Sequence, residues 1–430
     1  MNSLVKKHVL ENGLTILTKE IHHASLISHW IWYRVGSRNE VAGKTGVSHW
    51  VEHMQFKGTQ KYPINVLDAA ISKVGGYWNA MTYLDWTTYY ETLPANKVSI
   101  AIDLEADRMV NSVFDQKETE LERTVIISER EGNENEPMFR LSEATRSAAF
   151  DQHPYGQQVI GEMRDLHSLS RDDLYNHYQQ YYTPENAVLA IAGDFNTEDL
   201  IKELTQKYAD IPTRKKSPHN KITPEITINE SDQITVEGPG DTVYVQISYR
   251  APKATDDDFF VLMVLDSLLT GPASLSMFGG GSISNKTSRL YKKLVENNLS
   301  VNISGGLQAT IDPFLYDILA IISPEKDAQL IIKTITEEID RIQNNSVSQV
   351  EIDRAIKQAK ALFAYGSESI TNQAFWMGYS SMFADYTWFD TYIDNLEKIT
   401  KDRILSAAQK YLDPNHRIIG IYRPLQKENT

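Results

Sequence analysis

A pair of histidines with a glutamate between them is the strongest chemical signal in the sequence. His49, Glu52 and His53 lie in "GVSHWVEHMQFKGTQKY", residues 46–62, directly after Thr45, which we predict to cap a helix. Positions four apart share one face of a helix, so both imidazoles can reach one metal ion, and Glu52 leans to the same side. This pattern is typical of metal-assisted hydrolysis, in which two neutral imidazoles hold zinc and a carboxylate takes a proton from water. The alternative is a pair of surface histidines with no metal.

A catalytic zinc ion needs a third protein ligand, and the chain offers several carboxylates. In "KETELERTVIISEREGNENEP", residues 117–137, Glu118, Glu122 and Glu129 recur on one helical face. A solvated acidic face is the alternative, and on these residues alone the choice stays open. The chain has no cysteine, so disulfides, thiolate zinc sites and cysteine nucleophiles are excluded.

Composition narrows the class of protein. A chain of 430 residues suits two large domains, and its net charge of −14 argues against nucleic acid as a partner. No apolar run is long enough to cross a bilayer, so we expect no membrane partner. The amino terminus has no apolar signal core, and Asn12-Gly13 between apolar residues predicts a β-hairpin there. A cytoplasmic location is therefore expected.

A polar stretch at mid-chain predicts the domain boundary. Residues 210–233 contain three prolines and no helical period, as an inter-domain linker does. We therefore predict a zinc-binding catalytic domain over 1–212, a linker over 213–234, and a homologous domain without the metal motif over 235–430.

The two halves of the chain resemble each other. "SRDDLYNHYQQYYTPENAVLAIAGD" from Ser170 matches "TKDRILSAAQKYLDPNHRIIGIYRP" from Thr400 at a constant offset of 230, and each predicts a capped amphipathic helix, a proline turn and a buried strand. The same offset maps His49 to Gly279 and His53 to Ile283, so only the first half keeps the histidines. Strands are predicted at 86–93 and 243–249, and long helices at 96–113, 118–134 and 350–365. The fold class predicted is α+β, with two homologous domains that each pack a mainly antiparallel sheet with helices.

Three separated motifs together resemble one known family. "HWVEHMQFKGT", "VGGYWNAMTYLDWTTYYETL" and "ELERTVIISEREGNENEP" are similar to the pitrilysin/insulinase family of inverted zinc peptidases, and most of all to its bacterial branch related to mitochondrial processing peptidase. The resemblance covers the whole chain, including the two homologous halves. It implies that His49 and His53 bind one Zn²⁺ per chain, and that Glu52 is the general base for the attacking water.

The resemblance also selects the third ligand. In the family this glutamate ends an Arg-x-Val-aliphatic-aliphatic-x-Glu segment about 76 residues after the second histidine, and here "RTVIISE" ends at Glu129. Glu129 is therefore expected to bind zinc rather than Glu131 or Glu134. Glu122, two turns earlier, takes the role of the accessory glutamate that supports the site.

A sheet edge beside the zinc is expected to hold the peptide substrate. In the family the strand after the glycine pair Gly75-Gly76 accepts a peptide as an additional strand, through hydrogen bonds that do not depend on its sequence. Asn79 and Ala80 match the positions that touch substrate. The alternative is that Asn79 only caps a turn.

One pair of family residues is missing from the second half. Complete members carry an Arg and, seven residues later, a Tyr after a segment that here begins at Ser288. These positions hold Val295 and Asn302, or Val301 if one residue is deleted. The resemblance therefore implies a zinc endopeptidase subunit whose homologous partner supplies Arg and Tyr in a heterodimeric chamber. A second copy of the chain is the alternative partner, and a non-catalytic structural or peptide-binding protein of the same fold is the alternative function.

Overall fold

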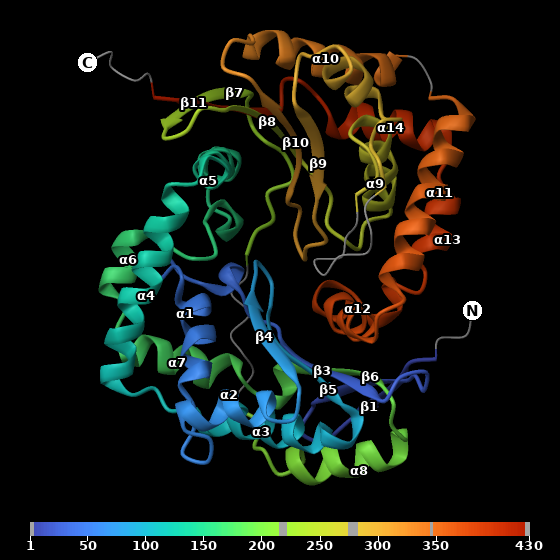
Figure 1. Ribbon diagram of the computed structural model, residues 1–430. Helices are drawn as coiled ribbons and strands as arrows, with labels where there is room; N and C mark the ends of the chain where they lie inside the picture. Colours follow the sequence, from blue (N-terminus) through green and yellow to red (C-terminus); the bar gives the residue numbers. More distant parts are fainter. Residues whose placement is uncertain (1–3, 215–221, 274–282, 345–346, 426–430) are drawn as a thin grey trace. The chain divides into compact units, whose positions relative to one another are not determined.

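Two compact units, each a β-sheet packed with helices, form the part of the chain that the computed structural model describes (Figure 1). The described residues are 4–214, 222–273, 283–344 and 347–425. Unit 1 comprises Met1–Arg130, Gln157–Lys221 and Ser367–Asp390, and unit 2 comprises Glu131–Gly156, Ile222–Gly366 and Thr391–Thr430. The α+β prediction is confirmed, whereas the boundary at 213–234 stays a prediction about the two sequence halves. None of the helices in the described segments is both long and apolar enough to cross a bilayer.

The sheet of unit 1 has six strands in the order β1-β2-β6-β3-β5-β4. Its strands are β1 (Lys6–Val9), β2 (Thr15–Glu20), β3 (Leu26–Tyr33), β4 (Tyr77–Thr82), β5 (Thr87–Pro94) and β6 (Ala187–Gly193). Only β2 and β6 pair in parallel. The hairpin predicted at Asn12-Gly13 is formed by β1 and β2. The helices are α1 (Val47–Met54), α2 (Ile64–Ser72), α3 (Val98–Asn111), α4 (Gln116–Glu134, which runs on into unit 2), α6 (Met163–Ser168), α7 (Arg171–Tyr181), α8 (Thr197–Tyr208) and α12 (Ile370–Phe383).

The sheet of unit 2 repeats this plan with five strands in the order β7-β11-β8-β10-β9. Its strands are β7 (Asp232–Gly238), β8 (Val243–Arg250), β9 (Asn302–Leu307), β10 (Leu315–Ile322) and β11 (Arg417–Pro424). Here β7 and β11 form the parallel pair, as β2 and β6 do in unit 1. The helices are α5 (Pro137–Ala149), α9 (Asp257–Leu269), α10 (Ala328–Asn344), α11 (Gln349–Gly366), α13 (Tyr392–Glu397) and α14 (Lys401–Tyr411). The equal strand order and directions are what an internal duplication predicts.

The strand register shows that the offset between the halves is not constant. Tyr33 lies opposite Ala187 in unit 1 and Tyr249 lies opposite Arg417 in unit 2, so the offset is 230 for β6 and β11 but 216 for β3 and β8. In unit 2, α9 therefore follows β8 as α1 follows β3 in unit 1, and it packs on β9 as α1 packs on β4.

The constant offset consequently gave wrong counterparts for the two histidines. Their counterparts belong on α9 and not at Gly279, which lies outside the described residues, or at Ile283. The reason is physical: the connections between strands and helices differ in length in the two halves, whereas the strand pairing is the same. The caps predicted from the repeat are confirmed, because Ser170 and Thr400 accept hydrogen bonds at the starts of α7 and α14.

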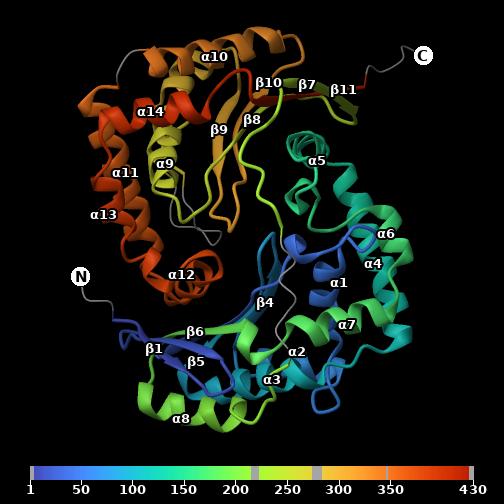
Figure 2. The same cartoon turned by 180° about the vertical axis from the view of Figure 1, so that it is seen from behind.

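Each unit takes one helix from the other half of the sequence. Helix α5 packs on β11, β8 and β7 of unit 2, and α12 packs on β3 and β6 of unit 1 (Figures 1 and 2). In unit 1 Phe375 of α12 sits 5.6 Å from Trp30, which stacks on Tyr90 at 4.0 Å. A Cβ at Gly378 would lie 1.9 Å from the Trp32 indole, so glycine is what lets α12 come this close to the sheet.

Candidate metal centre

Helix α1 carries both histidines and is held at its start by side chains from elsewhere. Its N-cap is Gly46, so the cap predicted at Thr45 is wrong. Thr45 instead donates its hydroxyl to Asp165 at 2.8 Å. The N–H groups of Gly46 and Ser48 donate to the two oxygens of Glu40, each at 2.8 Å. Glu40 thus supplies the acceptors that a local cap would supply, and burial raises its pKa to about 8 although these hydrogen bonds lower it.

Three potential metal ligands converge on one point. Within the described part of the chain, His49, His53 and Glu129 are the one group of three or more such residues, and their ligand atoms lie within 4.8 Å of one another. Nε2 of His49 is 3.9 Å, and Nε2 of His53 is 3.7 Å, from the Glu129 carboxylate. Ligands of a tetrahedral zinc ion lie about 3.3 Å apart, since each bond is about 2.0–2.1 Å long. The Glu129 side chain is 43% exposed and can rotate to close the remaining gap.

A second carboxylate orients one of the imidazoles. Nδ1 of His53 is 2.8 Å from Glu122, which lies two turns before Glu129 on α4 and also pairs with Lys57. Nδ1–H donating to Glu122 leaves the Nε2 lone pair directed at the group of ligands, which is the usual arrangement of a metal-binding histidine. Burial raises the pKa of Glu122, but the hydrogen bonds from His53 and Lys57 outweigh it and keep that pKa below its ordinary value. Glu122 is therefore a buried anion.

The two histidines differ in electrostatic surroundings. Burial, followed by the neighbouring His53, lowers the pKa of His49 to about 3, which keeps this imidazole neutral and able to bind a cation. Burial also lowers the pKa of His53, but the hydrogen bond to Glu122 and the charges of Glu52, Glu122 and Glu129 raise it above its ordinary value overall. These carboxylates therefore favour the protonated form of His53.

Glu52 is buried on the same helix and is held by Thr82. It is 8% exposed, and Thr82 at the end of β4 donates to its Oε2 at 2.6 Å. Burial raises the pKa of Glu52 to about 6, although the hydrogen bond from Thr82 lowers it. A carboxylate with a pKa near neutrality can both take up and return a proton.

The strand expected to bind a peptide is a sheet edge. Strand β4 pairs with β5 on one side only, and Tyr77 at its start is 58% exposed. Asn79 lies inside this strand, so it does not cap a turn. Its side-chain oxygen accepts the N–H of Ala80 at 2.9 Å, which keeps one edge donor satisfied.

In unit 2 the helix that corresponds to α1 carries a buried carboxyl group. Asp266 of α9 is buried and accepts from Thr270 at 2.6 Å and from Tyr316 at 2.9 Å. The positions expected to lack Arg and Tyr lie in a π-helical turn (Val295) and at the first residue of β9 (Asn302), and Val301 is 67% exposed.

Two residues that contact the centre were not predicted from the sequence. Lys57 follows His53 by four positions, so helical spacing could have placed it beside His53. Because Glu122 binds His53, Lys57 could then have been expected to reach Glu122 as well. Thr82 gave no signal, because it reaches Glu52 only through the fold.

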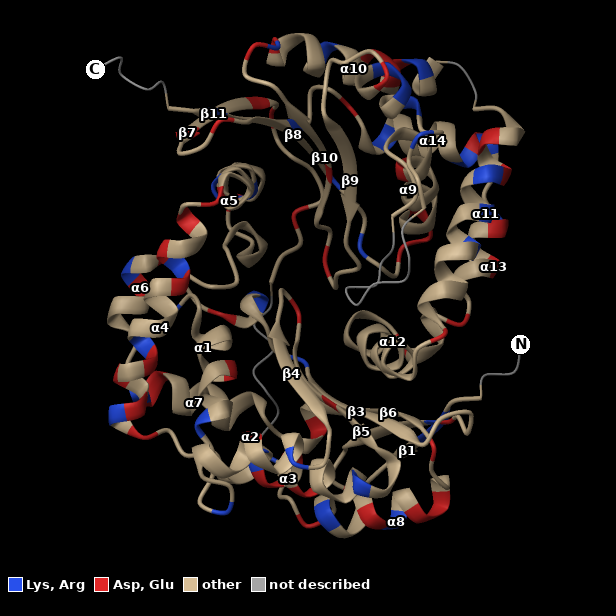
Figure 3. Cartoon of the chain, in the orientation of Figure 1, with Lys and Arg blue, Asp and Glu red and all other residues tan. Residues whose placement is uncertain are grey.

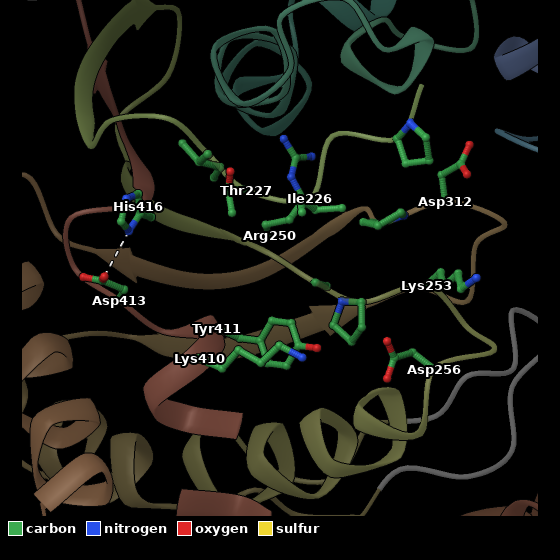
Figure 4. Close-up of a pocket in the computed structure, with 15 residues that line it drawn as sticks. Ile226, Thr227, Arg250, Lys253, Asp256, Asp312, Lys410, Tyr411, Asp413 and His416 are labelled. Atoms are coloured by element: carbon green, nitrogen blue, oxygen red, sulfur yellow. Dashed lines mark hydrogen bonds and ion pairs between the residues drawn. The ribbon is translucent and has the colours of Figure 1, made fainter. Parts of the chain in front are cut away.

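A cavity elsewhere in the described residues shows no comparable group of potential metal ligands. It measures about 460 Å³ and lies within unit 2 (Figure 4). Two of its three acidic residues are paired with histidines, Asp413 with His416 at 2.9 Å and Asp312 with His153 at 3.1 Å, and the third, Asp256, caps α9. Acidic and basic residues are interspersed along α8 and α11, as on solvated helix faces (Figure 3). Among the described residues, the group of potential metal ligands is therefore the one at α1 and α4.

Comparison with known proteins identifies the family to which the chain is similar. Residues 15–163 match the family model described as Insulinase (Peptidase family M16), and residues 168–359 match the model described as Peptidase M16 inactive domain. An uncharacterized zinc protease of Mycobacterium leprae is 25% identical over 97% of this chain and 92% of its own length. The mitochondrial-processing peptidase subunit beta of Lentinula edodes is 26% identical over 94% of this chain and 86% of its own length. A protease from Helicobacter pylori has the same fold, with a TM-score of 0.90 at 23% identity over 98% of this chain and 99% of that one.

Proposed function

Because the chain belongs to the insulinase family of metallopeptidases, peptidase family M16, we propose that it is a zinc-dependent endopeptidase subunit. The observation that carries the proposal is the convergence of His49, His53 and Glu129 beside the buried Glu52. Two imidazole nitrogens and one carboxylate, with room for a fourth ligand, form the donor set of catalytic zinc sites.

The proposed division of labour follows from the contacts. His49 and His53 would hold the metal through Nε2, and Glu129 through its carboxylate. Zinc bound there would polarise the substrate carbonyl and make water a better nucleophile at neutral pH. Glu52, which is held by Thr82, takes the proton of the attacking water and returns it to the leaving amine. Glu122 keeps His53 in the orientation that binding requires.

The free edge of β4 is the proposed place for the peptide. A peptide strand there gains main-chain hydrogen bonds irrespective of its sequence. Ala80 would donate its N–H to the peptide, and Asn79 must first release that group. Asn79 and Ala80 thus bind substrate in this proposal.

The proposed peptidase works with a partner. Val295 and Asn302 occupy the positions where complete members carry the Arg and Tyr that stabilise the developing oxyanion. A homologous subunit would supply both, and the two chains would enclose the peptide in a chamber. The relative named as subunit beta of a processing peptidase supports this reading. A second copy of this chain is the other candidate partner, and the cytoplasmic location stays a prediction.

Glu52→Gln tests the proposed chemistry. The amide is close to isosteric but cannot take a proton, so this variant should keep zinc and lose about 10²- to 10⁴-fold in cleavage rate. The assay is mass-spectrometric detection of products from a peptide mixture, because the chain without a partner is expected to be slow. Equal cleavage by zinc-loaded wild type and Glu52→Gln would remove Glu52 from the mechanism.

A second candidate is a non-catalytic peptide-binding protein of the same fold. The lack of Arg and Tyr at Val295 and Asn302 favours it. Stoichiometric zinc and saturable peptide binding without any cleavage, alone or with a homologous partner, would establish this alternative.

A further inference from the structure

The short helix that carries the two histidines depends on Glu40, seven positions before its first residue. Helix α1 has eight residues, and Gly46 offers no side chain to cap it. Helices of this length are unstable by themselves. Glu40 supplies the missing acceptors, since its two oxygens bind the N–H groups of Gly46 and Ser48. Glu40 is 7% exposed, so water does not compete for these hydrogen bonds.

The segment that carries Glu40 is itself fastened to the β4–β5 hairpin. The N–H groups of Ser37 and Arg38 donate to the carbonyls of Tyr83 and Leu84, at 3.1 and 2.8 Å. A Cβ at Gly36 would lie 2.3 Å from the Tyr83 carbonyl, so only glycine permits this approach.

A second contact returns from α1 to the same segment. The hydroxyl of Ser48 donates to the Gly36 carbonyl at 3.1 Å. Residues 36–40 thus join the start of α1 to the connection that follows Thr82, the residue that donates to Glu52. The metal-binding helix and the edge strand are linked through this one segment.

We infer that Glu40 is a positioning residue, which holds α1 at a fixed distance from β4 so that His49, His53 and Glu52 stay in register with the edge strand. The effect on metal binding and cleavage rests on the proposed function, whereas the mechanical role does not. Glu40→Gln separates the two, because the amide keeps the size of the side chain but can accept only one of the two N–H groups. The other N–H then faces an NH₂ group and loses its hydrogen bond.

The test compares Glu40→Gln with Glu105→Gln. Glu105 is also a buried carboxyl of unit 1, but the groups that it interacts with are Arg108 on α3, Glu91 on β5 and His29 on β3. Hydrogen exchange of the metal-free protein should become about 10-fold faster at the α1 amides in Glu40→Gln and remain at the wild-type rate there in Glu105→Gln. The zinc dissociation constant should rise about 10-fold or more in Glu40→Gln only, comparable to the loss of other supporting contacts.

The outcomes separate the two proposals. Faster exchange confined to α1, with a wild type that binds no zinc, would support the positioning role and refute the metal centre. Equal acceleration in α1 and α3, or none in α1, would refute the positioning role. If Glu40→Gln does not fold, Ser48→Ala removes the contact to Gly36, together with the contact to His177, and should give the same pattern at smaller amplitude; an unchanged α1 in that variant would also refute the positioning role.

Discussion

Substituting Glu122 by Gln should weaken zinc binding without removing any ligand. The His53 Nδ1 is 2.8 Å from one Glu122 oxygen, and Lys57 pairs with the other. A glutamine has one oxygen and one NH₂ group in the same place. If its oxygen accepts from His53, the NH₂ group faces the Lys57 ammonium, and if the amide is flipped, the NH₂ group faces the His53 N–H. Either way one of the two buried hydrogen bonds is lost.

The expected loss of zinc affinity follows from what a carboxylate that orients a metal-binding histidine usually contributes. Loss of a carboxylate that orients a metal-binding histidine typically costs 10- to 100-fold in affinity, which is about 1.4–2.7 kcal/mol. Removing the cation as well should restore part of this, because the introduced amide, without Lys57 beside it, can direct its oxygen at His53 freely. Glu122→Gln combined with Lys57→Met should therefore bind zinc more tightly than Glu122→Gln alone.

The assay is a zinc titration against a chromophoric chelator, with circular dichroism to show that each variant is folded. Glu118→Gln is the matched control, since it removes the same charge from the same helix one turn earlier and contacts neither histidine. Equal zinc affinity in wild type and Glu122→Gln, or an equal loss in Glu118→Gln, would refute the reasoning, because it would mean that the buried Glu122–His53 contact does not support the metal.

Two further predictions concern the fold. Gly378→Ala should lower the free energy of unfolding by about 1–3 kcal/mol, because its methyl group would overlap the Trp32 indole. Gly366→Ala should not lower it, because a Cβ there meets nothing within 4 Å. The measurement is thermal unfolding, and equal midpoints for the two variants would contradict the prediction. Glu351 accepts a hydrogen bond from Arg289 at 2.9 Å. Burial raises the pKa of Glu351, but the hydrogen bonds from Arg289 and Ser348 lower it to about 2. The contribution of Glu351 to the free energy of unfolding is therefore present above the ordinary pKa of 4.5 and is lost as the pH falls toward 2. Glu351→Gln should therefore cost about 2 kcal/mol at pH 7 and less at pH 3 in urea unfolding, and a cost independent of pH would exclude this pairing.

Local sequence signals predicted much of the architecture. The strands expected at 86–93 and 243–249 are β5 (Thr87–Pro94) and β8 (Val243–Arg250), and the helix expected at 118–134 is α4 (Gln116–Glu134). These elements have apolar periodicity, which is a local property. The exchange of α5 and α12 between units could not be predicted, because the same apolar face fits either sheet and only the tertiary fold decides which sheet it covers.

In the candidate site too, residues related by local spacing were predicted, and residues that meet only through the fold were not. Helical spacing brought His49 and His53 together, and the family resemblance selected Glu129, whose carboxylate lies beside them. The cap at Thr45 was wrong because a carboxylate six positions before the cap residue occupies the start of α1, and a distant buried acceptor leaves no local pattern. Thr82 was missed for the same reason. Residues that bind one another across elements need the fold before they can be recognised.

The most direct test of the central claim is the zinc content of the full chain after exhaustive dialysis, measured for wild type, Glu129→Gln, Glu131→Gln and Glu134→Gln. All three glutamates lie on α4, but only Glu129 reaches the histidine nitrogens, at 3.9 and 3.7 Å. The metal centre proposed here predicts about one zinc per chain in wild type, Glu131→Gln and Glu134→Gln, and little in Glu129→Gln, because an amide supplies no charge to the ion. Equal zinc in all four proteins, or none in wild type, would contradict it.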